Sequence, residues 1–522
     1  MSAVAATPGL AIRAKGHPLL VVAALMLASF TVGFDTRVFS VGLTDLRGAF
    51  DLGFDEGSWL STFAAAPQIL LAPAVPWLVS VFGVRRVMIG PCLAYAVLSL
   101  LIPEIHSIQV LLALHVARAV MLGIFIPATV MITFRNLPPR YWIVGLAIYS
   151  MRLPLSQNIG IFLVGLYTEK FGLQWLYWQD VFLTPMIALL IYLGAPKEPV
   201  EVGRLKTADW GGMLLLGSAI TLVYIALDQG NRLNWFGSGT VVSLFAAGAV
   251  LLILFLINEA VVQDPWAHAS VLASRNLILG LSTIVAYVAA STTSFLLIPG
   301  FLETVAGLRP VEIGDLYIPA AILPLFCTVP IAAAFLYRFD ARWGLAIGFS
   351  LMAVGSLLAA PVTGAWALPN FALIIVLQIV GQSFALLSVI TFIIANANPK
   401  KPTSGSAYTQ VVRLAGAELA ATLMSTFITK REQYHSNILG LHVTRAGEAT
   451  ADALDRLVPV FKGTSSSPTA DAAVTLAGRV AEQAYVLAYA DGFRMALFGA
   501  VVGLVLTALM KSSPPSSLSA RW

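Results

Sequence analysis

The stretch LLVVAALMLASFTVGFDTRVFSVGL, from Leu19 to Leu43, decides the fold class of this chain. It carries only two charged residues, Asp35 and Arg37, and it is long enough to cross about 30 Å of hydrocarbon as a helix. Similar stretches recur along most of the sequence, and only 11% of the 522 residues are charged. Soluble globular proteins have about 25% charged residues. We therefore predict an all-α, multi-pass membrane protein.

The distribution of basic residues predicts the topology. Sixteen lysines and arginines fall in the segments predicted inside, and four fall in short outside loops. This asymmetry favours an even number of spans with both ends cytoplasmic, and it accounts for the net charge of +5 without nucleic acid as a partner. The fourteen predicted spans lie at about 18–43, 57–79, 86–104, 108–134, 141–167, 174–194, 210–228, 237–258, 276–302, 313–337, 342–360, 370–395, 404–428 and 490–511.

Two similar loops suggest an internal duplication. LVSVFGVRR (78–86) joins the second and third spans, and FLYRFDARW (335–343) joins the tenth and eleventh. If spans 7 and 8 are an insertion, both loops hold the same place in a six-helix unit, which is the usual build of a secondary transporter. Alternatively, these are ordinary basic turns at cytoplasmic helix ends. The predicted parts are a cytoplasmic N-terminus 1–17, a six-helix bundle 18–194, two inserted helices 210–258, and a second six-helix bundle 276–511.

A polar segment at 430–488 interrupts the second bundle between spans 13 and 14. It is too long for a simple connection, and its pieces TADALDRLVPVF and DAAVTLAGRVAEQAYVLAYA have helical character. We expect a periplasmic helical hairpin. It either docks a partner or caps the mouth of the protein.

Several motifs together resemble one family. FDTRVFSVGLTDLRGAF followed by DEGSWLSTFAAAPQILL, then ARAVMLGIFIPATVMI, GLYTEKFGLQWLYWQD and VVRLAGAELAATL are similar, in this order, to the fourteen-helix drug:proton antiporters of the major facilitator superfamily. The resemblance implies two six-helix bundles plus two central helices, and proton-coupled efflux across the bacterial inner membrane. It also implies a tripartite pump, with a periplasmic adaptor and an outer-membrane channel as partners.

The sequence departs from the family pattern at three places. The loop after the second span retains Gly83, Arg85 and Arg86, the conformational loop of the family, but lacks its first glycine and its acidic residue. The fourth span has methionine where the family has glutamine. The fifth span reads MRLPLSQNIGIFLVG, which adds Arg152, Gln157 and Asn158 to the motif associated with export.

Charged residues inside the spans are the candidate functional groups, because a charge at the bilayer centre costs several kcal/mol. Asp35 lies at the family's acidic position and Glu418 lies among small residues of span 13, so we expect both to carry protons. Arg118 matches the arginine of the fourth span and is expected to tune a neighbouring acid. A static salt bridge is the alternative for Asp35, and His115 is expected to be a packing residue.

The remaining polar groups are candidates for substrate binding: Arg37, Arg152, Gln157, Asn158, Asp180 and Arg413. Asp35 and Arg37 are two positions apart and point about 200° away from each other on a helix, so they have separate roles. Arg37 either extends to the periplasmic interface or faces the substrate path. Four intramembrane arginines against three acids favour an anionic or zwitterionic amphiphile.

The sequence thus predicts a secondary active transporter that exports a hydrophobic or amphiphilic compound. A dedicated metabolite exporter or an importer of the same fold, and a receptor that does not transport, are alternatives. A lipid-modifying enzyme is a weaker one, because His435 and His442 stand in no catalytic spacing. The sequence contains no phosphate-binding loop of the form GxxxxGK[ST] and no Cys/His cluster, so we expect no cofactor and no metal.

Overall fold

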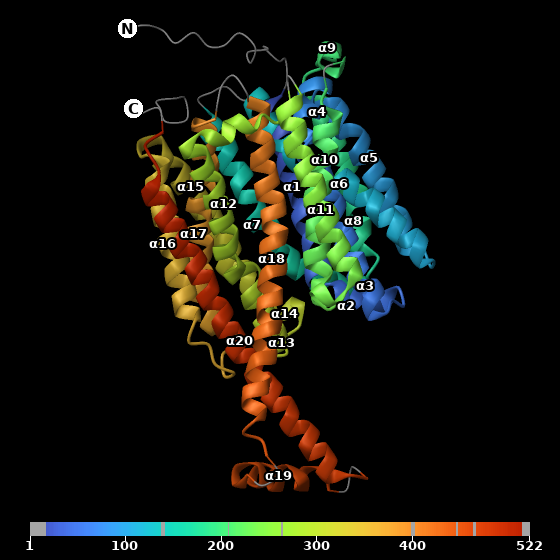
Figure 1. Ribbon diagram of the computed structural model, residues 1–522, viewed down its shortest axis with the longest axis vertical. Coiled ribbons are helices and arrows are strands. Elements are labelled where there is room, and N and C mark those ends of the chain that lie inside the picture. The colour runs from blue at the N-terminus through green and yellow to red at the C-terminus, as the bar shows by residue number, and fades with distance from the viewer. Residues whose placement is uncertain are drawn as a thin grey trace.

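The regular elements in the part of the chain that the structure describes are all helices (Figure 1). The computed structural model describes residues 17–136, 141–206, 208–262, 265–397, 402–444, 447–462 and 466–513. The helices are α1 Pro18–Ser40, α2 Leu43–Ala49, α3 Phe54–Leu71, α4 Val75–Phe82, α5 Val84–Leu101, α6 Ile108–Asn136, α7 Trp142–Leu166, α8 Trp175–Gly194, α9 Val202–Lys206, α10 Trp210–Gly230, α11 Gly239–Val261, α12 Arg275–Thr292, α13 Ile298–Thr304, α14 Pro310–Tyr317, α15 Leu323–Arg338, α16 Ala341–Ala359, α17 Leu368–Ala395, α18 Pro402–Gly440, α19 Glu448–Phe461 and α20 Pro468–Leu509.

The prediction of an all-α, multi-pass fold is confirmed. Within the described residues, twelve helical segments are long and apolar enough to cross a membrane, and the bent pair α3–α4 makes a thirteenth. Helix α7 adds 25 largely apolar residues, enough to cross the hydrocarbon at 1.5 Å per residue. These segments agree with the fourteen predicted spans. Most of the predicted N-terminal segment 1–17 lies outside the described residues.

Three spans are interrupted in the interior of the protein. Helices α3 and α4 meet at an angle of 52°, at a break that contains Pro73. The π-helical turns η6 (Thr293–Leu297) and η7 (Ile318–Ile322) divide the α12–α13 and α14–α15 spans. The Tyr317 hydroxyl donates a hydrogen bond of 2.7 Å to the carbonyl of Ser294, which ties the two interrupted spans together. Such π turns widen a helix and often occur at functional sites.

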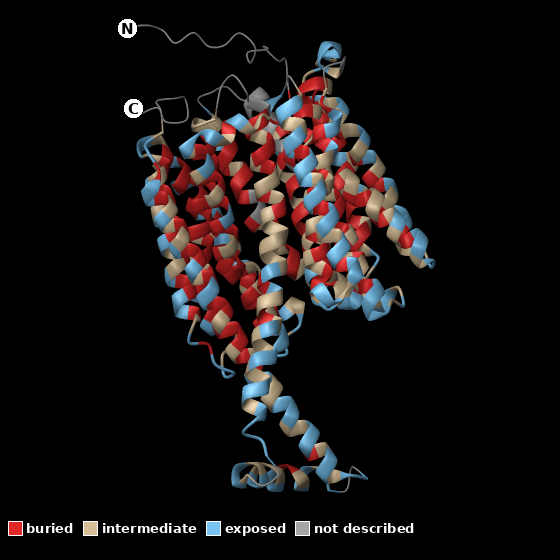
Figure 2. Ribbon diagram, viewed as in Figure 1, coloured by how far each residue is buried: buried red, intermediate tan, exposed pale blue. Residues whose placement is uncertain are grey.

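The membrane helices form two groups that meet along the middle of the molecule (Figure 1). In the N-terminal group α1 packs against α6, α7 and α8, and α5 packs against α6 and α8. In the C-terminal group α16 packs against α17 and α20, and α12 packs against α17, α18 and α20. Helix α7 also contacts α14, α15 and α17, so it joins the two groups. Buried residues lie inside each group and exposed ones around the outside (Figure 2).

Helices α10 and α11 lie where the sequence predicts two inserted helices. Helix α10 packs against α3 of the first group and α18 of the second, whereas α11 packs mainly on α10. Most of α11 is exposed, including apolar side chains such as Val250 and Ile253, as expected for a surface that faces lipid. Helix α10, but not α11, therefore lies at the seam between the groups.

The segment 430–488 does not fold back over the bundle. Helices α18 and α20 continue past the ends of their neighbours, and α19 lies across their far end (Figure 1). At the base of this projection, Asp491 of α20 pairs with Arg431 of α18 at 2.6 Å and with His435 at 2.8 Å. These contacts hold the two long helices together where they leave the bundle.

Candidate functional site

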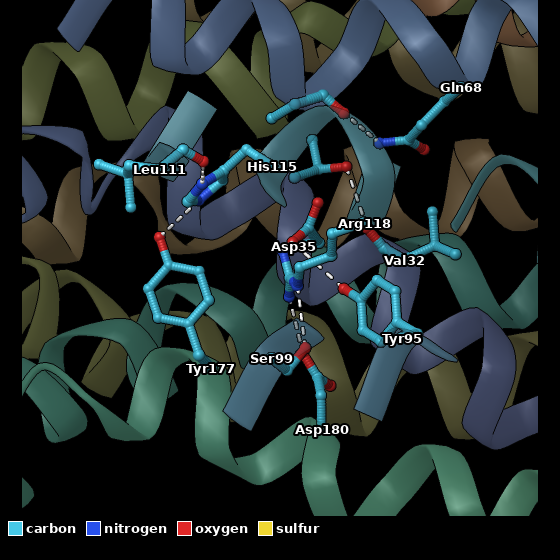
Figure 3. Close-up of polar contacts among 12 residues, drawn as sticks. Val32, Asp35, Gln68, Tyr95, Ser99, Leu111, His115, Arg118, Tyr177 and Asp180 are labelled. Carbon is cyan, nitrogen blue, oxygen red and sulfur yellow. Dashed lines mark hydrogen bonds and ion pairs between the residues drawn. The ribbon is translucent and has the colours of Figure 1, made fainter. Parts of the chain in front are cut away.

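A buried ion-pair cluster lies inside the N-terminal group. Arg118 of α6 donates from Nη1 to Asp35 Oδ1 of α1 at 2.5 Å and from Nη2 to Asp180 Oδ2 of α8 at 2.9 Å. Its Nε donates to the Ser99 hydroxyl of α5 at 3.0 Å. Figure 3 shows the guanidinium between the two carboxyl groups. The side chains of Asp35, Arg118 and Asp180 are at most 3% exposed. We call these four residues the Arg118 cluster.

Aromatic rings enclose the cluster. The Arg118 guanidinium lies 4.4 Å from the ring centre of Tyr95 and 5.2 Å from that of Tyr177, and the Tyr95 hydroxyl donates to Asp35 at 3.4 Å. His115 contacts the Leu111 carbonyl through Nδ1 and the Tyr177 hydroxyl through Nε2. His115 is thus a hydrogen-bonded packing residue, as predicted. The structure brings Asp35, Arg118 and Asp180 together, and sequence reasoning missed the pairing of Arg118 with Asp180.

The Arg118 cluster opens onto a central cavity between the two groups of helices. One compartment has a volume of about 250 Å³ and the other about 100 Å³, and they share Thr36, Gln68, Gln157, Phe295, Glu418 and Ala421. Asp35 lines the larger compartment, so the same carboxyl group touches both Arg118 and the cavity.

Arg37 faces this cavity and does not extend to the membrane interface. Its Nε donates to the Gln157 carbonyl of α7 at 2.8 Å and its Nη1 to the Phe295 carbonyl of η6 at 2.7 Å. Gly160 allows this path, because an added Cβ there would lie 2.8 Å from Arg37 Cγ. The residue therefore bridges α1 to both helix groups. Its buried Nη2 has no hydrogen-bond partner among the described residues.

A carboxyl group that the sequence analysis missed lines the same compartment. Asp228, near the end of α10, accepts a hydrogen bond of 2.5 Å from the Thr62 hydroxyl of α3 and shares the compartment with Glu418 of α18. Glu418 lines both compartments of the cavity. Asp228 is the last residue of the predicted span 210–228, so the sequence places it at a boundary position. The signal that could have found it is an acid within the final turn of an otherwise apolar span.

The other predicted substrate-binding residues divide between the cavity and the protein interior. Gln157 and Arg413 line the cavity, and Arg413 donates to Gln410 Oε1 through Nε at 3.1 Å and Nη2 at 2.6 Å. Asn158 is buried and donates to the Pro154 carbonyl at 2.7 Å, and it lines neither compartment. Asp180 belongs to the Arg118 cluster instead. The side chain of Arg152 lies outside what the structure describes.

The predicted conformational loop lies at the opposite end of the bundle from the α19 projection (Figure 1). Gly83 separates α4 from α5 with a φ of +78°, a backbone conformation that favours glycine. Arg86 donates to the Glu198 carbonyl at 2.9 Å, and the Arg85 guanidinium lies 4.5 Å from the Tyr192 ring centre. The loop is therefore anchored to the segment that follows α8.

Two groups of membrane helices around a central polar cavity define a membrane transporter. The family described as the Major Facilitator Superfamily matches residues 25–421. The chain belongs to this superfamily, so it is a multi-pass membrane transporter and not an enzyme.

Similar proteins of known name and fold support this assignment. The chain is 24% identical to the "Probable multidrug resistance protein EmrY" of Escherichia coli K12, over 85% of this chain and 84% of that protein. It is 23% identical to the "Multidrug export protein EmrB" of the same organism, over 79% and 80%. Among solved structures it resembles the proton:xylose symporter XylE, with a TM-score of 0.55 at 10% identity, over 95% of this chain and 96% of that chain.

Proposed function

We propose that this protein exports hydrophobic or amphiphilic compounds across the bacterial inner membrane in exchange for protons. The relatives named as multidrug export and resistance proteins support the direction and the broad substrate class. The observation that carries the coupling is the position of Asp35, which contacts Arg118 on one side and the cavity on the other.

The charge balance of the Arg118 cluster is the basis for coupling proton binding to transport. Two carboxylates and one guanidinium leave one excess negative charge, which is costly in a buried site. One added proton makes the cluster neutral. A proton that reaches Asp35 from the cavity thus converts the cluster from negatively charged to neutral. Arg118 keeps Asp180 as its partner in either state.

The cavity lining favours a zwitterionic amphiphile. Arg37 offers an unused buried Nη2, whereas Asp228 and Glu418 offer carboxylates in the same compartment. Tyr149, Tyr287 and Phe295 provide apolar and aromatic surface in the adjoining compartment. Arg413 also lines this compartment, and its Nε and Nη2 donate to Gln410 Oε1.

Transport by purified protein in proteoliposomes tests this function. Norfloxacin, a fluorescent zwitterion, is placed on the cytoplasmic side of the protein, and proton movement is followed with a pH dye. We expect norfloxacin to drive counter-movement of protons through the native protein, and Asp35→Asn to abolish it. Asp315→Asn, an exposed acid on α14, is the matched control. If native protein and Asp35→Asn transport equally well down an imposed proton gradient, the coupling assignment is wrong.

We further propose that the projection of α18, α19 and α20 binds a periplasmic adaptor, which would continue the path to an outer-membrane channel. Its support is the outward direction of the projection and its exposed apolar side chains, which include Leu441, Val460 and Val474. Replacing residues 441–467 with a short Gly-Ser linker should leave transport in proteoliposomes intact. The same change should abolish export from cells across both membranes, and unchanged export would refute the docking role.

A further inference from the structure

A second pocket lies at the predicted cytoplasmic end of the N-terminal group, far from the central cavity. It has a volume of about 540 Å³ and lies between the start of α5, the end of α8 and the segment after α8. Its lining includes Gly83, Arg85, Arg86, Tyr192, Lys197 and Glu198. Three basic side chains face one carboxylate, so the pocket carries a net positive charge.

The two arginines are held in place but retain donors. Arg86 is anchored by the carbonyls of Glu198 and Phe82, at 2.9 and 3.3 Å. Arg85 is stacked over Tyr192, and its buried Nε has no partner among the described residues. Stacking fixes the guanidinium plane and leaves its edge available, which suits a phosphate oxygen.

The start of α5 adds to this positive potential. The helix begins at Val84 without a side-chain cap, and its N-cap residue Gly83 lines the pocket. Arginine at a helix N-terminus is unfavourable, because both carry positive charge. An anion bound there would offset both charges, and the sequence places Arg85 and Arg86 in this first turn.

Below the pocket the protein surface is apolar. Helices α5 and α8 pack side by side, and both expose large aliphatic side chains toward the lipid, including Leu93 and Val97 on α5 and Leu189 and Leu193 on α8. A basic pocket at the membrane interface thus continues directly into a surface that acyl chains can cover.

The corresponding loop of the C-terminal group is built differently. There Asp340 caps α16 by accepting a hydrogen bond from the Arg342 amide, and it pairs with the Arg342 side chain at 3.0 Å. Arg342 also donates to the Met510 carbonyl at 3.1 Å. In the first loop no acid precedes the arginines, where Ser80 and Gly83 stand instead, and the carboxylate beside this loop belongs to Glu198 of the segment after α8.

We propose that the pocket formed by Arg85, Arg86, Tyr192 and Lys197 binds the phosphate of an anionic phospholipid of the inner leaflet. The acyl chains of this lipid lie along α5 and α8. The phosphate takes the free donors of Arg85 and the charge of Lys197, and the bound lipid holds the α4–α5 loop against the end of α8. This site is separate from the central cavity and does not depend on the proposed export function.

Native mass spectrometry of the full-length protein in detergent tests the proposal. The probes are palmitoyl-oleoyl phosphatidylglycerol, the same lipid with a phosphatidylcholine headgroup, and soluble glycerol 3-phosphate. We expect the native protein to retain phosphatidylglycerol in preference to phosphatidylcholine. Each of Arg85→Gln and Arg86→Gln should weaken phosphatidylglycerol binding by about tenfold or more, because each removes charge-assisted hydrogen bonds.

Two further variants separate lipid recognition from damage to the loop. Lys197→Gln leaves both arginines in place and should weaken binding several-fold at unchanged thermal stability, because Lys197 is exposed. Arg338→Gln with Lys511→Gln removes two exposed charges from the same end of the protein, outside the pocket, and should have no effect.

Two outcomes would overturn the proposal. Equal retention of phosphatidylglycerol by the native protein and by the Arg85→Gln/Arg86→Gln variant would show that the pocket does not bind the headgroup. Displacement of the lipid by an equal concentration of glycerol 3-phosphate would show a site for small soluble anions, without a contribution from the acyl chains.

Discussion

Replacing Arg118 with leucine is expected to destabilise the protein more than any single change to the acids around it. The substitution removes the guanidinium that pairs with both Asp35 and Asp180, whose side chains are 3% and 0% exposed. Breaking a buried ion pair from one side costs about 3–5 kcal/mol, and here two carboxylates, Asp35 and Asp180, are left in the interior without their partner. We therefore expect Arg118→Leu to lower the free energy of unfolding by about 3–5 kcal/mol.

The acids should behave differently. Asp35→Asn leaves Arg118 paired with Asp180 at 2.9 Å and weakens one acceptor, but it also removes the excess negative charge of the cluster, so we expect it to change the free energy of unfolding by no more than about 1 kcal/mol. Adding Asp35→Asn and Asp180→Asn to Arg118→Leu removes every charge of the cluster. The triple variant should therefore be more stable than Arg118→Leu alone.

Unfolding of the purified protein in detergent, followed by tryptophan fluorescence, measures these differences. Arg204→Leu is the control, because Arg204 and its partner Glu201 are each 56% exposed and such pairs contribute less than about 1 kcal/mol. If Arg118→Leu is no less stable than Asp35→Asn, or if the triple variant recovers nothing, the argument from buried charge is wrong.

Three further predictions concern the residues around the cavity and the loop. Arg37→Leu should lower the free energy of unfolding by about 2–4 kcal/mol and stop transport, because the hydrogen bonds to the Gln157 and Phe295 carbonyls are lost; unchanged thermal stability would contradict this. Gly83→Ala should destabilise the protein by about 1–2 kcal/mol, because its φ is +78° and the new Cβ would lie 2.8 Å from Glu198 Oε2; Gly90→Ala, in open space on α5, is the control. Asp228→Asn and Glu418→Gln should each reduce transport of norfloxacin more than transport of a carboxylate without an amine. Initial rates of transport in proteoliposomes measure the difference. Equal reduction for both substrates would contradict a role of these acids in recognising the amine.

The membrane fold could be predicted from the sequence because it depends on local composition. In most cases the spans begin and end within a few residues of the predicted positions, since a helix in lipid must satisfy its own backbone hydrogen bonds over a fixed thickness. The sequence predicts that spans 13 and 14 end where the polar segment begins, because the composition changes there. In the structure α18 and α20 continue into that segment as unbroken helices. The hairpin elements themselves were recognised from their periodicity.

The sequence by itself also determined the candidate functional residues, because a charge within an apolar span is costly wherever it lies. That reasoning identified Asp35, Arg118 and Asp180, but it did not pair Arg118 with Asp180, since they lie 62 positions apart on α6 and α8. Only the tertiary structure decided that Arg37 faces the cavity while Asn158 bonds within its own helix. It alone brought Asp228 of α10 beside Glu418 of α18, because which face of a helix meets a neighbour depends on packing between helices far apart in the chain.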